Sequence, residues 1–162
     1  MILLHYSLSK DLWRRFFEVH YAADPTLKTR YLWGVICIVS GALGFGGFYH
    51  SPLIAALLLA TGFYGVLSRQ LLVIKSLRGA VRHPFYGQTL SVGLNRERIS
   101  VRSGEAGYDQ PWSNFIGYRE SKTGFMFYHD KSSFFFIPSE ALTNRQATEL
   151  RQLLADCGLT RL

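Results

Sequence analysis

The sequence contains a long interval without charged residues. Between Arg30 and Arg69 there are 38 residues with no Asp, Glu, Lys or Arg, although these four types make up 18% of the 162-residue chain. Soluble helices usually combine an apolar face with a charged one, so this interval is not typical of a soluble protein. The same absence argues against an ion channel, a proton relay or a transporter. We therefore expect the interval to lie within a membrane.

Residues that carry out chemistry are also scarce. The two cysteines, Cys37 and Cys157, lie in the uncharged interval and near the C-terminus, so no disulfide framework is expected. The five histidines are scattered, and none has a metal-ligand spacing from another histidine, a cysteine or a carboxylate. We identify no catalytic, cofactor-binding or metal-binding residues and no small-molecule substrate. The expectation is a protein that is not an enzyme.

The uncharged interval is too long for one membrane span. A single helix of this length would measure about 57 Å, whereas the hydrocarbon core of a bilayer is about 30 Å thick. The chain should turn at Tyr49–Pro52, because proline suits the first turn of a new helix. This predicts a two-helix transmembrane hairpin over residues 31–68. Two pairs of small residues are expected to allow close packing of the helices: Ser40 with Gly44, and Ala56 with Ala60.

Basic residues flank the hairpin but are absent from its turn. They are Lys10, Arg14, Arg15, Lys28 and Arg30 before it, and Arg69, Lys75, Arg78 and Arg82 after it. By the positive-inside rule, both termini should be cytoplasmic. Residues 1–30 carry a net charge of +2 and residues 69–87 carry +4, so residues 88–162 hold only +1 of the total +7. A nearly neutral C-terminal region argues against nucleic-acid binding.

The basic residues after the hairpin suggest a second membrane contact. Lys75, Arg78 and Arg82 are spaced to share one face of a helix over residues 69–83, which His83-Pro84 should end. Cations at this place attract anionic lipid headgroups. Contact of these three residues with anionic lipid is therefore one hypothesis, but the favoured interpretation is that the cations only enforce topology.

After Pro84 the apolar residues alternate with polar ones, as in β-strands. Six short strands are predicted, around residues 90–94, 99–101, 108–112, 115–118, 125–128 and 134–137. A closing helix should begin at Thr143, which forms a capping box with Gln146, and end at Gly158. Near the N-terminus, Ile2–Leu8 is a further strand and Lys10–Ala22 is a helix.

We expect the first strand to join the later strands, because an isolated strand with exposed edges is unfavourable. The fold class is therefore a membrane α+β protein. A transmembrane hairpin is inserted between strand one and the remaining strands of a pleckstrin-homology-like (PH-like) antiparallel β-barrel or sandwich with a C-terminal helix. The predicted segments are residues 1–30 (N-terminal strand and amphipathic helix), 31–68 (hairpin), 69–83 (basic helix) and 84–162 (PH-like domain).

Two aromatic features of this domain allow either a structural or a binding role. Trp112 could contact a ligand, but a core position in a small barrel is favoured. The run Phe134–Phe136 could form an aromatic platform for a ligand. The favoured interpretation places alternate rings in the core and leaves one exposed, since neighbouring strand residues point to opposite faces.

The order of these elements resembles a known family. The segments LSVGLNRERISVRS, QPWSNFIGYRES, GFMFYH and FFFIPSEAL follow the hairpin and basic linker, and within them Trp112 with Ile116 and Ile137-Pro138 with Ala141-Leu142 are the most specific. Together they resemble the bacterial YcxB-like membrane proteins. The resemblance implies a small multi-pass protein of the bacterial inner membrane with a PH-like cytoplasmic domain. It brings no established activity or site residues.

These observations lead to two hypotheses of function. The first is a membrane-anchored, non-enzymatic binding or regulatory module at the cytoplasmic face of the inner membrane. Its partners would be membrane lipids and either another protein or a second copy of the chain. The alternative is an immunity or self-protection protein, in which the hairpin neutralises a membrane-acting toxin.

Overall fold

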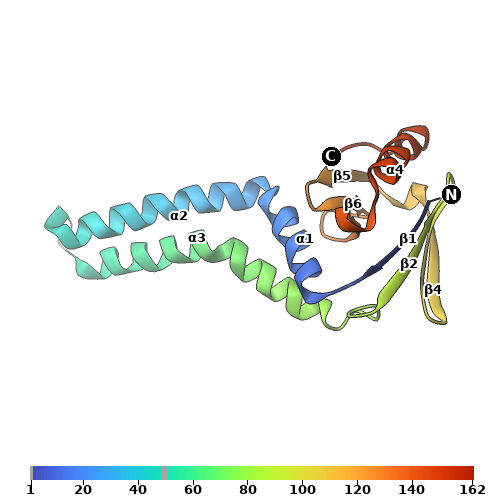
Figure 1. Cartoon of the computed structure of the whole chain (residues 1–162). Helices are drawn as coiled ribbons and strands as arrows, with labels where there is room; N and C mark the ends of the chain where they lie inside the picture. Colours follow the sequence, from blue (N-terminus) through green and yellow to red (C-terminus); the bar gives the residue numbers. More distant parts are fainter. Residues whose placement is uncertain (1, 49–50) are drawn as a thin grey trace. The chain divides into compact units, whose positions relative to one another are not determined.

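The computed structural model describes residues 2–48 and 51–162. The chain forms two compact units (Figure 1). One, which we call the β unit, combines the N-terminal residues up to Phe16 with Ala80–Leu162. The other, the helical unit, is Phe17–Gly79. The β unit is thus assembled from two segments separated in sequence by the helical unit.

The first sheet of the β unit has four antiparallel strands in the order β1-β2-β3-β4. Their bounds are β1 Ile2–Ser7, β2 Thr89–Leu94, β3 Arg98–Ser103 and β4 Ala106–Pro111. In β1 buried and exposed residues alternate, and Leu4 on the buried face pairs with Val92 of β2. This confirms the predicted pairing of the first strand with the later ones. The hairpin is inserted between β1 and β2.

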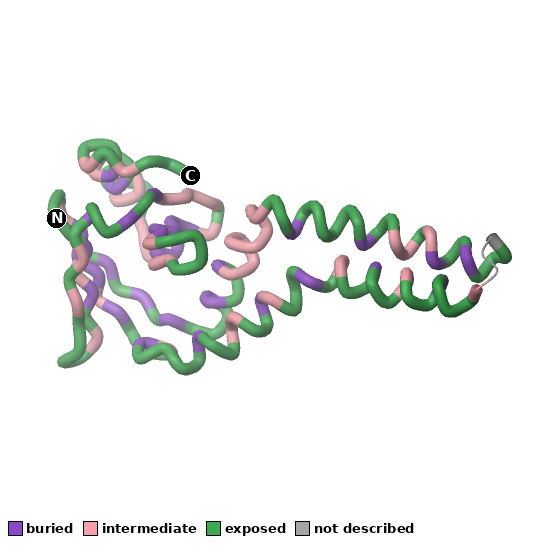
Figure 2. The backbone as a smooth tube through the Cα atoms, turned by 180° about the vertical axis from the view of Figure 1, so that it is seen from behind, coloured by how far each residue is buried: buried purple, intermediate pink, exposed green. Residues whose placement is uncertain are grey.

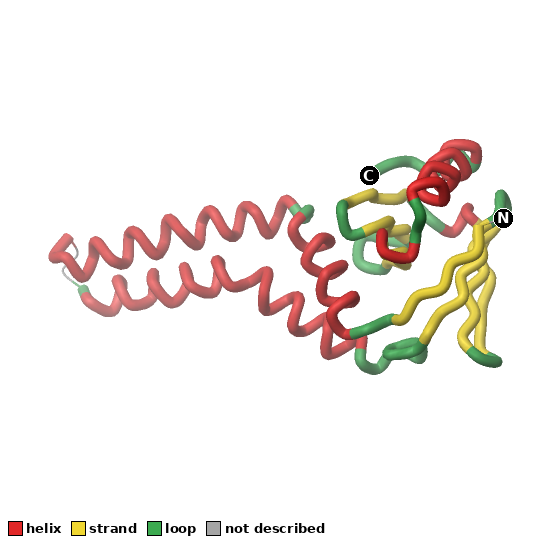
Figure 3. The backbone as a smooth tube through the Cα atoms, viewed as in Figure 1, coloured by secondary structure: helices red, strands yellow, loops and turns green. Residues whose placement is uncertain are grey.

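A second antiparallel sheet of three strands follows, in the order β5-β6-β7. It consists of β5 Gly117–Ser121, β6 Gly124–Tyr128 and β7 Phe134–Pro138, and the 3-10 turns η2 Trp112–Asn114 and η3 Ser139–Ala141 lie before β5 and after β7. All six predicted strands are present, although β5 begins two residues later than expected. The two sheets do not join into a closed barrel, so the barrel form of the prediction is wrong (Figure 3).

Helix α1, Lys10–Ala22, has the predicted bounds and contributes apolar side chains to the β unit. Phe16 is fully buried and stacks on Phe136 of β7, with ring centroids 4.2 Å apart. Trp13 meets the same ring edge-on at 4.8 Å. These aromatic contacts fix the start of α1 to the second sheet.

The last helix, α4 (Asn144–Asp156), begins at the predicted capping box of Thr143 and Gln146. Its Leu150 and Leu154 are fully buried. Gly158 follows with φ +68°, a conformation that favours glycine after a helix end. The chain then runs beside β5, where the Tyr118 N–H donates to the Thr160 carbonyl at 2.9 Å and the Tyr118 carbonyl accepts from Leu162 N–H at 2.8 Å.

The helical unit contains two long antiparallel helices that lie side by side (Figure 3). The first is α2 Pro25–Leu43, followed by a π-helical segment η1 Gly44–Phe48, and the second is α3 Pro52–Ala80. Helix α2 begins six residues before the expected span, because Asp24 caps it by accepting from Thr26 N–H at 2.8 Å. The predicted turn residues Tyr49 and His50 lie outside the described residues.

The predicted basic helix is continuous with the second span, as expected, but it is shorter. Helix α3 ends at Ala80, so Arg82 lies in the following turn. Near the start of this helical stretch, the Arg69 guanidinium donates to the Glu18 carbonyl at 3.3 Å, and the hydroxyls of Tyr21 and Ser76 are 2.6 Å apart. The end of α1 therefore packs beside the C-terminal half of α3 within the helical unit.

Glycines bring the backbones of α2 and α3 into direct contact. A Cβ added at Gly34 would lie 2.8 Å from the Gly62 carbonyl, and one added at Gly41 would lie 2.9 Å from the Ala55 carbonyl. The expected pair Ala56 and Ala60 is exposed instead, so that part of the prediction is wrong. The contact positions recur every seven residues, a period typical of nearly antiparallel helices, rather than every four.

The outer surface of the helical pair is apolar. Only 17% of the most apolar 18-residue stretch of each helix is buried, whereas the core helix of a soluble protein would be mostly buried (Figure 2). Large apolar side chains are exposed along both helices, among them Leu32, Ile36, Val39, Leu43, Leu53, Leu57, Phe63 and Leu67. Both helices are long and apolar enough to cross a membrane.

The pairing of β1 with β2 predicts different effects at two adjacent leucines. Leu4→Ala should destabilise the β unit by about 2–5 kcal/mol, because the Leu4 side chain is 2% exposed in the core. Leu3→Ala should change stability by less than about 0.5 kcal/mol, because Leu3 is 53% exposed. Pulse proteolysis of the full chain in detergent at increasing urea measures both changes. Equal effects at the two positions would contradict the strand assignment.

Candidate functional site

The three predicted lipid-contact residues are exposed but do not share one helix. Lys75 and Arg78 lie on α3, whereas Arg82 lies beyond its end. Among the residues that the structure describes, no carboxylate lies within 4 Å of any of the three side chains, so their positive charges are not neutralised by an ion pair. The continuous helical face expected from the spacing therefore ends at Arg78.

A pocket of about 300 Å³ lies within the β unit, and we call it the aromatic pocket. Both sheets, α1 and the segment between α3 and β2 contribute to it. Its lining residues are Leu8, Trp13, His83, Phe85, Leu90, Tyr108, Gln110, His129, Ser133, Phe134, Phe135 and Phe136. The volume is at the lower end of the range for small-ligand pockets, and it is sufficient for one large side chain or a small aromatic molecule.

Contacts among the rings give the pocket a defined shape. Phe136, one of the lining residues, is 2% exposed, and its carbonyl accepts from the Tyr6 hydroxyl at 2.6 Å. The Phe85 and Tyr108 rings lie 5.9 Å apart, and His129 stacks on Phe115 at 4.2 Å. These contacts join the pocket walls to the core, so the rings that line it are held in place.

The pocket has no formal charge in its walls, since its lining includes no Asp, Glu, Lys or Arg. Desolvation lowers the pKa of His83 and so favours its neutral imidazole, while burial raises the pKa of the Tyr108 hydroxyl. The uncharged polar groups available to a ligand therefore include the Tyr108 hydroxyl, the Gln110 amide, the Ser133 hydroxyl and the His83 imidazole. Such a lining suits an uncharged group, because a charge would lose its hydration without gaining an oppositely charged partner.

The aromatic residues considered from the sequence have different positions. Trp112 is 5% exposed, its ring lies 5.7 Å from Phe127, and its Nε1–H donates to the Asn95 carbonyl at 2.7 Å, so it is a core residue. In the run Phe134–Phe136, Phe136 is buried but the other two rings are only half-buried, and all three line the pocket. The expectation that alternate rings lie in the core and one ring is exposed is therefore wrong, because none of the three is exposed.

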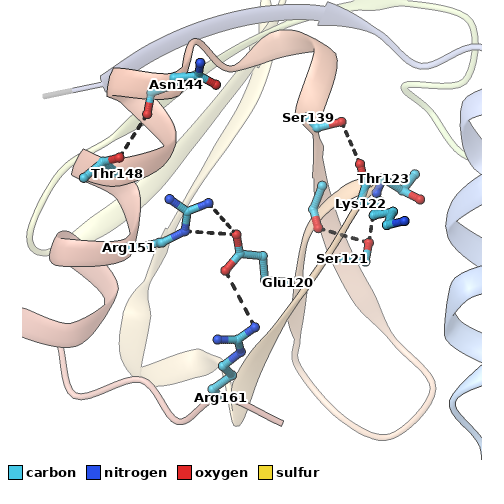
Figure 4. Close-up of polar contacts among 10 residues, drawn as sticks. Glu120, Ser121, Lys122, Thr123, Ser139, Asn144, Thr148, Arg151 and Arg161 are labelled. Carbon is cyan, nitrogen blue, oxygen red and sulfur yellow. Dashed lines mark hydrogen bonds and ion pairs between the residues drawn. The ribbon is translucent and has the colours of Figure 1, made fainter.

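A charged cluster holds the opposite edge of the second sheet (Figure 4). Glu120 of β5 accepts from the Arg151 guanidinium of α4 at 2.7 Å and lies 3.9 Å from that of Arg161 (Figure 4). These pairs join α4 and the C-terminal residues to β5. Every member has a structural partner, so we regard the cluster as a support for the second sheet.

Within the described ranges, no group of three or more His, Cys, Asp or Glu residues could hold a metal ion. The sequence did not reveal the aromatic pocket, because its lining comes from segments that only the topology brings together. The run of three phenylalanines was the one signal of it. The pocket and the exposed basic residues are therefore the two candidate sites of interaction.

Part of the β unit is similar to a known protein family. The family model described as YcxB-like protein matches residues 94–154, from the end of β2 to α4. This confirms the resemblance found in the sequence over that part of the chain. No curated protein and no solved structure matches the chain.

The desolvated imidazole at the pocket makes the stability of the β unit depend on pH. Because the folded state lowers the pKa of His83 below its ordinary value of 6.5, the unfolded state binds the proton more readily. The contribution of His83 to stability is present above pH 6.5 and is lost as the pH falls through the folded-state pKa. Urea midpoints at pH 7.5 and 5.5 should therefore differ less in His83→Phe, which keeps a ring beside Trp13 and Phe85, than in the parent protein. The same pH dependence in both proteins would contradict this.

Proposed function

We propose that this chain is a membrane-anchored, non-enzymatic binding module of the bacterial inner membrane, with its β unit on the cytoplasmic side. The observation that carries the proposal is the insertion of the helical pair between the paired strands β1 and β2. Since the chain leaves the β unit after Phe16 and returns to it at Ala80, a hairpin of two spans brings it back to the same side of the membrane. The flanking cations support a cytoplasmic placement of that side.

We further propose that the β unit is PH-like. Four plus three antiparallel strands followed by a C-terminal helix support this outline. The fold by itself does not define a ligand, because one fold can carry many functions. The ligand has to be inferred from the site.

The aromatic pocket supports a binding role over toxin neutralisation. A protein that blocks a membrane-acting toxin would act through its hairpin, whereas the shaped and uncharged pocket lies in the β unit. A preformed pocket that combines aromatic rings with uncharged polar groups is a candidate binding site. We therefore assign recognition to the β unit and anchoring to the hairpin.

The topology can be measured with single cysteines in a background where Cys37 and Cys157 are replaced by Ala. Lys131→Cys is in an exposed turn of the β unit, and Ser51→Cys precedes α3 at the turn of the hairpin. In intact spheroplasts, a membrane-impermeant maleimide should label position 51 but not position 131, and in inverted vesicles the pattern should reverse. Labelling of both positions from the same side would overturn the proposed topology.

Anionic lipid contact can be tested in the full chain. Replacing Lys75, Arg78 and Arg82 by Gln should reduce the amount of phosphatidylglycerol retained in mixed detergent–lipid micelles and make the remainder less sensitive to salt, because each cation near the surface contributes about 1 kcal/mol. Retained lipid is measured by native mass spectrometry. A matched control replaces three exposed cations of the β unit, Lys10, Lys122 and Lys131, by Gln. Unchanged retention in the first variant, or equal loss in both, would remove the lipid-contact claim.

A further inference from the structure

The free edges of the two sheets differ in how their backbone groups are satisfied. At β5, the outward N–H and C=O of Tyr118 bond to the C-terminal residues. At β7, the Phe136 carbonyl accepts from Tyr6, and Pro138 has no N–H to donate. At β1, the Leu3 carbonyl accepts from the Gln146 amide at 3.4 Å. Each of these edges is therefore at least partly covered.

The edge of β4 is different. The Trp112 N–H donates to the Glu97 carbonyl, so this pair of residues is hydrogen-bonded across the β3–β4 ladder. Hydrogen-bonded pairs alternate with non-bonded pairs in an antiparallel ladder, so the backbone groups of Gln110 and Tyr108 also bond to β3. The backbone groups of Gly107 and Asp109 consequently point away from the sheet. Within the described part of the chain, no hydrogen bond to these outward groups is formed. They are available to an added strand.

The same strand forms a wall of the aromatic pocket. Tyr108 and Gln110 are half-buried and line the pocket, whereas Gly107 and Asp109, which alternate with them along the strand, are exposed. Since strand residues alternate between faces, a strand paired with β4 would direct every second side chain to the face on which the pocket lies. A backbone edge and a side-chain pocket are thus next to each other.

We propose that the β4 edge and the aromatic pocket together bind an extended segment of a partner protein. The segment adds as a further strand beside β4 and places one large, uncharged aromatic side chain in the pocket. This inference rests on the proposed function and names the partner class for the same site. Main-chain bonds to the outward groups of Gly107 and Asp109 hold the segment, and the pocket selects the side chain.

The chemistry of the site determines this occupant. The outward N–H and C=O groups of β4 complement a polypeptide backbone, which a lipid or a small aromatic molecule does not provide. The walls lack formal charge, so an aspartate, glutamate, lysine or arginine side chain would be desolvated without a partner. An aromatic side chain instead meets the rings of Trp13, Phe85 and Phe134 at a pocket volume of about 300 Å³.

The test uses the full chain in detergent micelles and a defined peptide as the probe. The probe is the acetylated and amidated heptapeptide Thr-Val-Thr-Trp-Thr-Val-Thr, in which the tryptophan and both valines share one face. Isothermal titration calorimetry should give saturable binding, and replacing the central tryptophan by alanine should weaken the affinity about tenfold or more. Absence of saturable binding would overturn the proposal, and equal affinity of the two peptides would overturn the pocket as the selecting site.

Two pairs of variants distinguish the contribution of the β4 edge to peptide binding from that of the aromatic pocket. Asp109→Pro removes an outward N–H and should weaken binding about tenfold, whereas Asp109→Ala loses the same carboxylate, keeps the N–H, and should stay within about twofold. Ser133→Trp fills the pocket from an exposed turn and should abolish binding, whereas Ser132→Trp in the same turn does not line the pocket and should stay within about twofold. Equal effects within either pair would overturn the role assigned to that part of the site.

The outcomes also separate this inference from the proposed function. Binding that depends on Asp109 N–H and on the pocket would stand even if cysteine labelling placed the β unit on the other side of the membrane. Conversely, the predicted labelling without peptide binding would leave the anchor in place and remove the strand-addition site. Free indole at millimolar concentration serves as a third probe. If it bound as tightly as the peptide and was insensitive to Asp109→Pro, the pocket would be a small-molecule site instead.

Discussion

The rest of the structure depends on the antiparallel ladder between β1 and β2. Its register runs from Ile2 opposite Leu94 to Ser7 opposite Thr89, so it joins two parts of the chain that are separated by the helical unit. The ladder places Leu4 and Tyr6 in the core and holds both ends of the inserted hairpin in one folded unit. Without it, α1 would have no fixed starting point and the β unit would lack one wall of its core.

Much of the fold could be predicted because local patterns and tertiary packing agree. Period-two burial in Ile2–Ser7, the capping box of Thr143 and Gln146, and the proline at the start of α3 each indicate the structure that forms. The helix contact at Gly34 and Gly62 could not be predicted, because several small residues compete and the crossing geometry selects among them. Whether the barrel closes could not be predicted from local sequence pattern either, because closure depends on the separation of the two sheets.

The candidate site was much less visible in the sequence than the fold. In the sequence, Tyr108 and Gln110 resemble ordinary strand residues. Only the register of β3 with β4 shows that their backbone groups bond to β3, while those of Gly107 and Asp109 do not. His83 was interpreted as a helix terminator, whereas its ring borders the pocket beside Trp13 at 5.6 Å. A site assembled from distant segments produces no characteristic residue spacing in the sequence. Its uncharged lining residues also resemble ordinary core residues.

The insertion between β1 and β2 also has a consequence for biosynthesis. About 80 residues separate the end of β1 from the start of β2, so at a translation rate of about 5–20 residues per second β1 is made roughly 4–16 s before its partner strand. During that time both long apolar helices are synthesised. The first strand must therefore remain without its partner strand until the whole helical unit has been made, and folding of the β unit follows synthesis of the helical unit rather than preceding it.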